Sequence, residues 1–398
     1  MLDEQAEPNT GFDNSSDGKS SFRSLKDLIE HVSGKRLGES QAQQDSGLAE
    51  VLPFPFLAMV GQEEMKYALL LALVNPAIGG VLLIGPRGTG KTTAIRGLVD
   101  LVPEVPRSLC YYGCLPEDIE IGGIDAVCPN CAQKYARGEP LAALDKVRLV
   151  ELPLNARIED VVGVVDDASM DHQRLRLHRG ILGHADRNLL LVDEVNLLSD
   201  EVVDAILDAA AYGSYTVRRG STAATYRARF VLIGTMNPEE GRLRPQIMDR
   251  FGLRLVIRGL DNIEQRLEAY KRVQTYLSKP RQVMLEYSDE TRIAQAEIQL
   301  ARDILPEVKV PEQVSKHGLD LIQQLNIDSL RAEITLFESS RALAALDNRK
   351  VVTLEDLSLI APMALRMRRS KFIEKYLSNQ NVEEKEIKKA VNEAWKTS

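Results

Sequence analysis

The sequence predicts a three-layer α/β sandwich built on a parallel sheet, followed by a smaller all-α domain. Short continuous apolar runs alternate with helical patterns from about residue 54 to residue 260, as expected for strands that helices cover on both faces. The strand candidates are residues 81–84, 149–152, 189–192 and 230–233. Beyond residue 260 only helical periodicity remains, which indicates a separate helical domain.

The helices between the strands are expected to form right-handed crossovers, which place them on the two faces of the sheet. Residues 92–101 and 200–211 have the required helical spacing of apolar side chains. The later helices are expected at residues 263–277, 289–303, 311–325, 331–347 and 354–369. We therefore divide the chain into residues 51–262, which form the α/β domain, and residues 263–398, which form the helical domain.

Residues 1–50 are rich in Ser, Asp, Glu, Gln and Gly, and we expect a disordered tail. Residues 68–85 are nearly all apolar, but Asn75-Pro76 and Gly79-Gly80 interrupt them. They are therefore interpreted as a helix that ends near Val74 and a buried strand, with no insertion into a membrane. The N-terminus has the features of neither a signal peptide nor a transit peptide, so we expect a cytoplasmic protein.

The charge balance bears on the class of partner. The chain of 398 residues carries 58 acidic and 50 basic side chains, a formal net charge of −8. Binding to a nucleic acid depends on a surplus of positive charge that displaces counterions from phosphates. The composition therefore argues against a motor that works on a nucleic acid.

The strongest motif is the run Gly85-Pro86-Arg87-Gly88-Thr89-Gly90-Lys91-Thr92, which follows a predicted strand and opens a predicted helix. Glycines allow backbone N–H groups to surround a triphosphate, and the helix N-terminus adds positive potential. Lys91 would neutralise the β- and γ-phosphates, and the Thr92 hydroxyl would hold Mg²⁺. The sequence thus predicts a site for ATP and Mg²⁺.

Polar residues follow two other predicted strands. Asp193 and Glu194 come directly after residues 189–192, where Asp193 would orient Mg²⁺ and Glu194 would polarise the attacking water. Asn237, after residues 230–233, is a candidate to contact the γ-phosphate, although, taken by itself, an Asn-Pro turn is the better explanation. Arg244 and Arg250 follow shortly after, and an arginine supplied by a neighbouring subunit can stabilise the transferring phosphoryl group.

All 4 cysteines lie in one insertion, at about residues 107–140, in the pattern C-x3-C-x13-C-x2-C. The Cys128-Pro129-Asn130-Cys131 turn can present two thiolates to one metal ion, and Cys110 and Cys114 supply two more. A structural Zn²⁺ site, an Fe–S cluster and unmetallated or redox-active thiols are all compatible with this pattern.

Two other clusters are assigned to the solvated surface. The first is a set of histidines spaced six residues apart, His172, His178 and His184. The second is a basic cluster at the end of the last predicted helix, Arg366, Arg368, Arg369 and Lys371.

Several motifs together closely resemble the ATPase (I) subunit family of magnesium chelatase, which are AAA+ motors. They are Val60-Gly61-Gln62-Glu63, the phosphate-binding loop, residues 192–198 and the segment 237–252, and the similarity extends from Phe54 to about Arg369. The resemblance implies the AAA+ P-loop fold, with Val60, Gly61 and Gln62 beside the adenine. It also implies that Asn237 is a sensor, that Arg250 is the finger offered to the next subunit with Arg244 as a second candidate, and that Arg331 is the second sensor. Two hairpins of the family match residues 160–183 and 212–229.

The resemblance further implies a homo-oligomeric ring, expected to be a hexamer, with ATP at each interface. Its implied partners are a D-type AAA+ subunit with an integrin-like domain and a large porphyrin-binding H-type subunit. The implied reaction is ATP-driven insertion of Mg²⁺ into protoporphyrin IX, on the route to chlorophyll or bacteriochlorophyll in photosynthetic organisms.

The chain departs from the family pattern at Pro86 and Thr92, at residues 234–236 and at residues 178–184. These departures are compatible with ATP hydrolysis, but they leave the metal and the tetrapyrrole open. The alternatives are cobalt insertion into a corrin precursor, remodelling of another metalloenzyme, and a partner that binds ATP without turnover. The intact set of Lys91, Asp193, Glu194 and Asn237 counts against the last of these.

Overall fold

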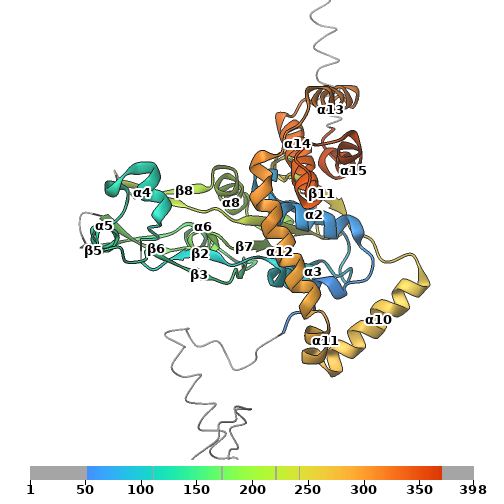
Figure 1. Cartoon of the computed structure of the whole chain (residues 1–398), viewed down its shortest axis with the longest axis horizontal. Helices are drawn as coiled ribbons and strands as arrows, with labels where there is room; N and C mark the ends of the chain where they lie inside the picture. Colours follow the sequence, from blue (N-terminus) through green and yellow to red (C-terminus); the bar gives the residue numbers. More distant parts are fainter. Residues whose placement is uncertain (1–51, 111, 172–173, 220–221, 242, 370–398) are drawn as a thin grey trace, which may run out of the picture. The chain divides into compact units, whose positions relative to one another are not determined.

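The computed structural model describes residues 52–369, apart from 111, 172–173, 220–221 and 242 (Figure 1). The predicted disordered tail, His172 and Lys371 lie outside these residues. None of the helices in the described part of the chain is long and apolar enough to cross a membrane.

A parallel sheet of five strands, in the order β11-β1-β10-β7-β4, confirms the predicted fold class. Its strands are β1 (Val81–Ile84), β4 (Leu149–Glu151), β7 (Leu189–Val192), β10 (Val231–Met236) and β11 (Leu253–Val256). β1 lies between β10 and β11, with Leu83 in register with Thr235. Because the strands are parallel, the carboxyl ends of β1, β7 and β10 meet at one edge of the sheet.

The apolar runs are continuous because both faces of the sheet are covered. In β1, Val81 and Leu83 belong to one core cluster, whereas Leu82 and Ile84 belong to the other. The first cluster includes side chains of α2 (Glu63–Val74) and α3 (Lys91–Leu98), and the second includes those of α8 (Asp200–Tyr212). This alternation follows from the two-residue period of a strand and produces the three layers.

Two strand predictions were wrong in detail. β10 continues to Met236, three residues past the predicted end, so Gly234 and Thr235 lie within the sheet. β11 was not predicted, because Arg254 interrupts its apolar run. The Arg254 side chain is nevertheless only 1% exposed, and it is paired with Asp249.

Two hairpins and an insertion extend from this core. The hairpins are β5 (Gly163–Asp171) with β6 (Arg174–Arg179), and β8 (Ser214–Arg219) with β9 (Thr222–Arg227). The insertion lies between β2 (Val105–Ser108) and β3 (Ala142–Asp145), which pair antiparallel, and it contains α4 (Pro116–Gly122) and α5 (Pro129–Ala136). The remaining short helices of this part are α6 (Ile158–Val162), α7 (Ile181–Ala185) and α9 (Pro245–Arg250).

A helical region follows the sheet, as predicted. It comprises α10 (Ile263–Ser278), α11 (Pro280–Glu286), α12 (Ser288–Ile304), α13 (Glu312–Gln324), α14 (Leu330–Leu346) and α15 (Leu354–Leu365). The single 3₁₀ turns of the described chain are η1 (Phe56–Ala58), η2 (Pro76–Ile78), η3 (Val99–Leu101), η4 (Ile124–Ala126), η5 (Val195–Leu197) and η6 (Leu305–Glu307). Asn75 joins the α/β core to α14, because its amide donates to the Glu338 carboxylate at 2.8 Å.

The prediction of a solvated basic helix end was wrong for two of its residues. α15 ends at Leu365, and the Arg368 side chain is fully buried against Asp249, at 2.8 Å. Arg366 donates to the Glu64 carboxylate at 2.9 Å and to the carbonyl of Arg254 at 3.2 Å. These arginines therefore join the C-terminal helix to the sheet instead of facing solvent.

Candidate functional site

The phosphate-binding loop joins β1 to α3 and turns sharply through its glycines. Gly88 and Gly90 have φ angles of 77° and 84°, a region that side chains with a Cβ rarely adopt, and Gly90 caps α3. At Gly85 a Cβ atom would lie 2.2 Å from the carbonyl oxygen of Ile257, the residue directly after β11, so this close approach requires glycine. The glycines of the motif thus serve both the shape of the loop and its packing.

Lys91 reaches back over this loop. Its Nζ donates to the carbonyls of Gly85 at 2.7 Å and Pro86 at 2.8 Å. Burial lowers the pKa of Lys91, although the nearby carboxylates of Asp193, Glu194 and Glu240 favour the charged form. The amine is therefore held at the mouth of the loop among acidic groups.

Thr235 organises the two acidic residues at the end of β7. Its hydroxyl donates to the Asp193 carboxylate and accepts from the backbone N–H of Glu194 at 3.0 Å. Glu194 has a φ of 50°, and the hydrogen bond from its N–H holds this unusual backbone conformation in place. Sequence reasoning missed Thr235, because it ended the strand at Ile233. The signal that could have identified it is a threonine two residues before Asn237 on the strand that follows the Asp-Glu pair.

One cavity of about 440 Å³ brings most of the predicted residues together. It is lined by Arg87, Gly88, Thr89, Gly90, Lys91, Thr92, Thr93, Asp193, Glu194, Thr235, Met236 and Asn237. Asn237 is buried there, and its side-chain oxygen also accepts from the Glu239 N–H at 3.2 Å. Asn237 therefore both stabilises the turn that follows β10 and lines the cavity, so the two interpretations of this residue are compatible. The Thr92 hydroxyl and the Asp193 carboxylate are oxygen donors of the kind that Mg²⁺ prefers, so this donor set fits Mg²⁺.

Arg87 links the loop to two carboxylates across the cavity. It pairs with Glu194 at 3.1 Å and with Glu240 at 2.5 Å. Its own side chain is 73% exposed. The pairing with Glu194 was not predicted, and it gives the loop a direct contact with the proposed water-polarising residue.

A second cavity, of about 470 Å³, shares Gly88, Thr89 and Gly90 with the first. Val60 and Gln62 line it, and the Gln62 amide donates to the Arg258 carbonyl at 2.6 Å. The cavity is also lined by Leu260, which precedes α10, and by four residues of α10, Arg266, Ala269, Arg272 and Val273. Gly61 does not line the cavity, but it packs so closely that a Cβ would lie 2.6 Å from Leu260. A largely apolar cavity beside the phosphate-binding loop has the character of a base-binding pocket.

The three predicted arginines do not line either cavity of this chain. Arg250, at the end of α9, pairs with Asp208 at 2.8 Å and with Asp204 at 3.4 Å, both on α8. Arg244 pairs with Asp200 at the start of α8. Arg331 is exposed near the start of α14.

The structure brings the four cysteines together, although the two pairs are far apart in sequence. Their sulfurs all lie within 4.8 Å of one another, and the group could hold a metal ion. Cys114, Cys128 and Cys131 are buried, and Cys110 is half-buried. A hydrogen bond from the Cys114 thiol lowers the pKa of Cys110 and raises that of Cys114 itself.

Of the three histidines spaced six residues apart, the structure describes only the side chain of His184. His184 is exposed on the short helix α7 rather than on a hairpin strand, and the side chain of His178 lies outside the described part of the structure.

Comparison with known proteins places these observations in a family. Residues 168–255 match the model of "Magnesium chelatase, subunit ChlI", and residues 319–390 match that of an AAA lid domain. The chain is 38% identical over 335 residues to a magnesium-chelatase subunit ChlI homolog of Methanocaldococcus jannaschii, covering 83% of this chain and 90% of that protein. It is 37% identical over 327 residues to magnesium-chelatase subunit ChlI of Nostoc, covering 82% and 86%.

A solved complex of the BchI and BchD subunits of magnesium chelatase contains a chain 37% identical to this one. The match covers 82% of this chain and 99% of that chain, with a TM-score of 0.46. The matches to the two sequence relatives each cover more than four fifths of this chain. The chain therefore belongs to the magnesium chelatase subunit ChlI family of AAA+ proteins with a lid domain.

Proposed function

We propose that this protein is the ATP-hydrolysing motor subunit of a magnesium chelatase. The observation that supports the proposal most strongly is the single cavity in which Lys91, Thr92, Asp193, Glu194 and Asn237 meet, in a chain of this family. A subunit that only bound nucleotide would not need the acidic pair at the end of β7 or the hydroxyl that positions it.

Each residue of the cavity has a distinct task in this proposal. Lys91 and the N-terminus of α3 bind the β- and γ-phosphates, and Thr92 with Asp193 would hold Mg²⁺. Glu194 accepts a hydrogen bond from the attacking water and orients it, while Asn237 donates to the γ-phosphate. When bound, Mg²⁺ neutralises charge on the phosphate oxygens. The cavity lined by Val60 and Gln62 takes the adenine.

Three arginines outside the two cavities are proposed to complete the site. Arg250 lines neither of the two cavities of its own chain, and its partly exposed side chain is paired with two exposed aspartates of α8. We propose that it reaches the ATP of a neighbouring copy in a homo-oligomeric ring, which the family resemblance suggests is a hexamer. Arg244 is a second candidate, and Arg331 is proposed to contact the γ-phosphate when the lid region moves.

The proposed substrates are ATP, Mg²⁺ as cargo, and protoporphyrin IX held by a large H-type partner, with a D-type subunit completing the motor. Mg²⁺ gives up its hydration shell reluctantly, which explains why insertion into four ring nitrogens would need a motor.

The test is an insertion assay with the purified chain as the only I-type subunit, together with D-type and H-type partners. ATP-dependent fluorescence of magnesium protoporphyrin supports the proposal. ATP hydrolysis without insertion, in a mixture that an established I subunit rescues, contradicts it. That result would direct attention to cobalt insertion into a corrin precursor or to remodelling of another metalloenzyme.

A further inference from the structure

The insertion between β2 and β3 has only a small apolar core among its described residues. Its hydrophobic cluster has five buried members, and three of them are cysteines, joined by Val127 and Leu141. The helix α4 buries no side chain, and α5 buries only Cys131. A segment with so little buried apolar surface needs a covalent or metal crosslink to be well ordered.

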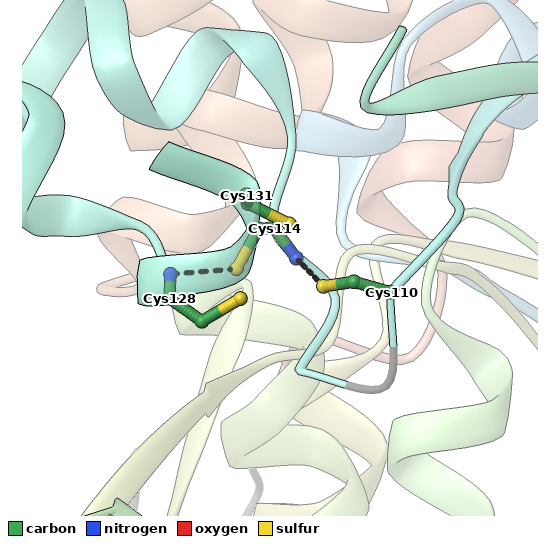
Figure 2. A group of neighbouring side chains, drawn as sticks. All are labelled: Cys110, Cys114, Cys128 and Cys131. Atoms are coloured by element: carbon green, nitrogen blue, oxygen red, sulfur yellow. Dashed lines mark hydrogen bonds between the residues drawn. The ribbon is translucent and has the colours of Figure 1, made fainter. Parts of the chain in front are cut away.

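The arrangement of the sulfurs indicates what that crosslink is. Figure 2 shows Cys110 and Cys114 from one segment facing Cys128 and Cys131 from another, with all four sulfurs within 4.8 Å of one another. Four thiolates at 2.3 Å around one tetrahedral ion would stand about 3.8 Å apart, so a small adjustment would complete the site. An Fe–S cluster places several atoms between its cysteine ligands and requires them to be further apart.

Backbone hydrogen bonds already support the sulfurs as ligands. The N–H of Cys114 donates to the sulfur of Cys110, and the N–H of Cys128 donates to that of Cys114, both at 3.3 Å (Figure 2). Such contacts orient ligating thiolates and stabilise their negative charge. From this geometry we infer that the four cysteines bind one structural Zn²⁺ ion, which holds the insertion together and fixes α4 against Arg187 and the β8–β9 hairpin.

The second half of this inference follows from the acidic residues of α4, which lie shortly after Cys114. Asp118 forms two hydrogen bonds to Arg227 at the end of β9, at 2.6 and 2.9 Å. Glu117 accepts from Arg187 at 2.9 Å, and that contact lowers the pKa of Glu117. Arg227 also donates to the carbonyl of Gly113, between the first two cysteines.

These contacts connect the zinc site to the nucleotide-binding strand. Arg187 has a φ of 59°, and two residues later the chain enters β7, whose far end carries Asp193 and Glu194. The zinc-bound insertion therefore braces the start of β7 and the base of the β8–β9 hairpin. All four coordination positions are filled by protein, which leaves none open for catalysis.

The metal content of the wild-type protein tests whether the four cysteines bind one Zn²⁺ ion, and this test needs no variant. After dialysis against zinc-free buffer, we expect about one zinc per chain by elemental analysis and no visible absorption from iron. Iron with inorganic sulfide, or a metal-free protein that takes up no added zinc or contains disulfides, would overturn the inference. Cys114→Ser and Cys131→Ser should each retain zinc at least about tenfold more weakly. Gln133→Ser, an exposed position on α5, should retain zinc like the wild type.

Hydrogen exchange tests whether the zinc-bound insertion stabilises the start of β7 and the base of the β8–β9 hairpin. Zinc removal from the wild-type protein should speed amide exchange in residues 109–141 and also around Arg187 and Arg227. The affinity for a fluorescent ATP analogue should stay the same, because the phosphate-binding loop lies at the other end of the sheet. Unchanged exchange around Arg187 and Arg227 would overturn the bracing role. Both measurements are independent of whether the motor serves magnesium.

Discussion

Thr235 and Asp193 are joined across two neighbouring strands, because the hydroxyl of Thr235 on β10 donates to the carboxylate that follows β7. The same hydroxyl accepts from the Glu194 N–H, so one buried side chain sets the positions of both acidic residues. The site thus depends on the pairing of β10 with β7 as much as on the motifs themselves.

Replacing Thr235 by valine keeps the shape of the side chain and removes this hydroxyl. We expect kcat for ATP hydrolysis to fall about 10- to 100-fold, because Asp193 loses the contact that orients it. Steady-state ATPase assays measure this. Thr235→Ser restores the hydroxyl and should restore most of the rate. Equal rates for the valine variant and the wild type would exclude Thr235 as a positioning residue.

Lys91 and Glu194 should separate ATP binding from hydrolysis. Lys91→Ala removes a charged donor and should weaken ATP binding by about 10- to 150-fold. Glu194→Gln keeps a polar group of the same size, so it should bind ATP normally while hydrolysis falls by about 100-fold or more. Titration with a fluorescent ATP analogue, followed by single-turnover hydrolysis, distinguishes the two. A glutamine variant that hydrolyses ATP at the wild-type rate would rule out the role proposed for Glu194.

Arg250→Ala should leave folding and ATP binding unchanged while hydrolysis in the assembled ring falls by about 1,000-fold. Mixing this variant with Lys91→Ala provides the decisive comparison. In a mixed ring, an Arg250→Ala subunit retains its own phosphate-binding loop and receives Arg250 from a Lys91→Ala neighbour. Turnover should therefore recover in part. Arg292→Ala, at a side chain that is 78% exposed, is the matched control. No recovery in the mixture would mean that Arg250 acts within its own chain or not at all.

We expect that replacing the buried Arg368 causes a large loss of stability. Its guanidinium donates to Asp249 at 2.8 Å, to the Gly252 carbonyl at 2.9 Å and to the Ala364 carbonyl at 2.6 Å. Arg368→Ala removes a fully buried charged donor and leaves the carbonyls of Gly252 and Ala364 without it, although Asp249 keeps Arg254, so the free energy of unfolding should fall by about 3–5 kcal/mol. Urea unfolding measures the change. Arg369→Ala, at an exposed neighbour, should cost much less, and equal costs for the two variants would contradict the account.

We expect the contribution of Asp356 to the stability of the folded protein to depend on pH. Burial raises its pKa, but hydrogen bonds from Arg349 and from the Thr353 N–H outweigh burial, so the net pKa is lowered. A carboxyl group with a lowered folded-state pKa stabilises the protein above its ordinary value of about 3.9, and this contribution is lost as the pH falls below that value. The stability advantage of the wild type over Asp356→Asn should therefore be full at neutral pH and shrink in acid. Asp347→Asn, at the more exposed acidic partner of Arg349, is the matched control for removing one carboxylate from the same arginine. A constant difference across the pH range would contradict the assignment.

The features that the sequence predicted correctly are those that a short stretch of residues determines by itself. Apolar runs identified β1 and β7 at their observed bounds, because strands buried on both faces leave a simple signal. The phosphate-binding loop was found because its glycines, lysine and threonine follow one another directly. β11 was missed and Arg368 was misjudged, since the burial of Arg254 and of Arg368 depends on Asp249 and on carbonyls from segments far away in the chain. Thr235 was missed for the same reason, because its role arises only when β10 pairs with β7.

The most direct test of the central claim is ATP-dependent insertion of Mg²⁺ into protoporphyrin IX, followed by fluorescence, with D-type and H-type partners. Wild-type protein should support insertion, Glu194→Gln should bind ATP without supporting it, and magnesium protoporphyrin should accumulate in step with ATP consumption. Hydrolysis by the wild type with no magnesium protoporphyrin formed, while an established I subunit forms it with the same partners, would contradict the claim.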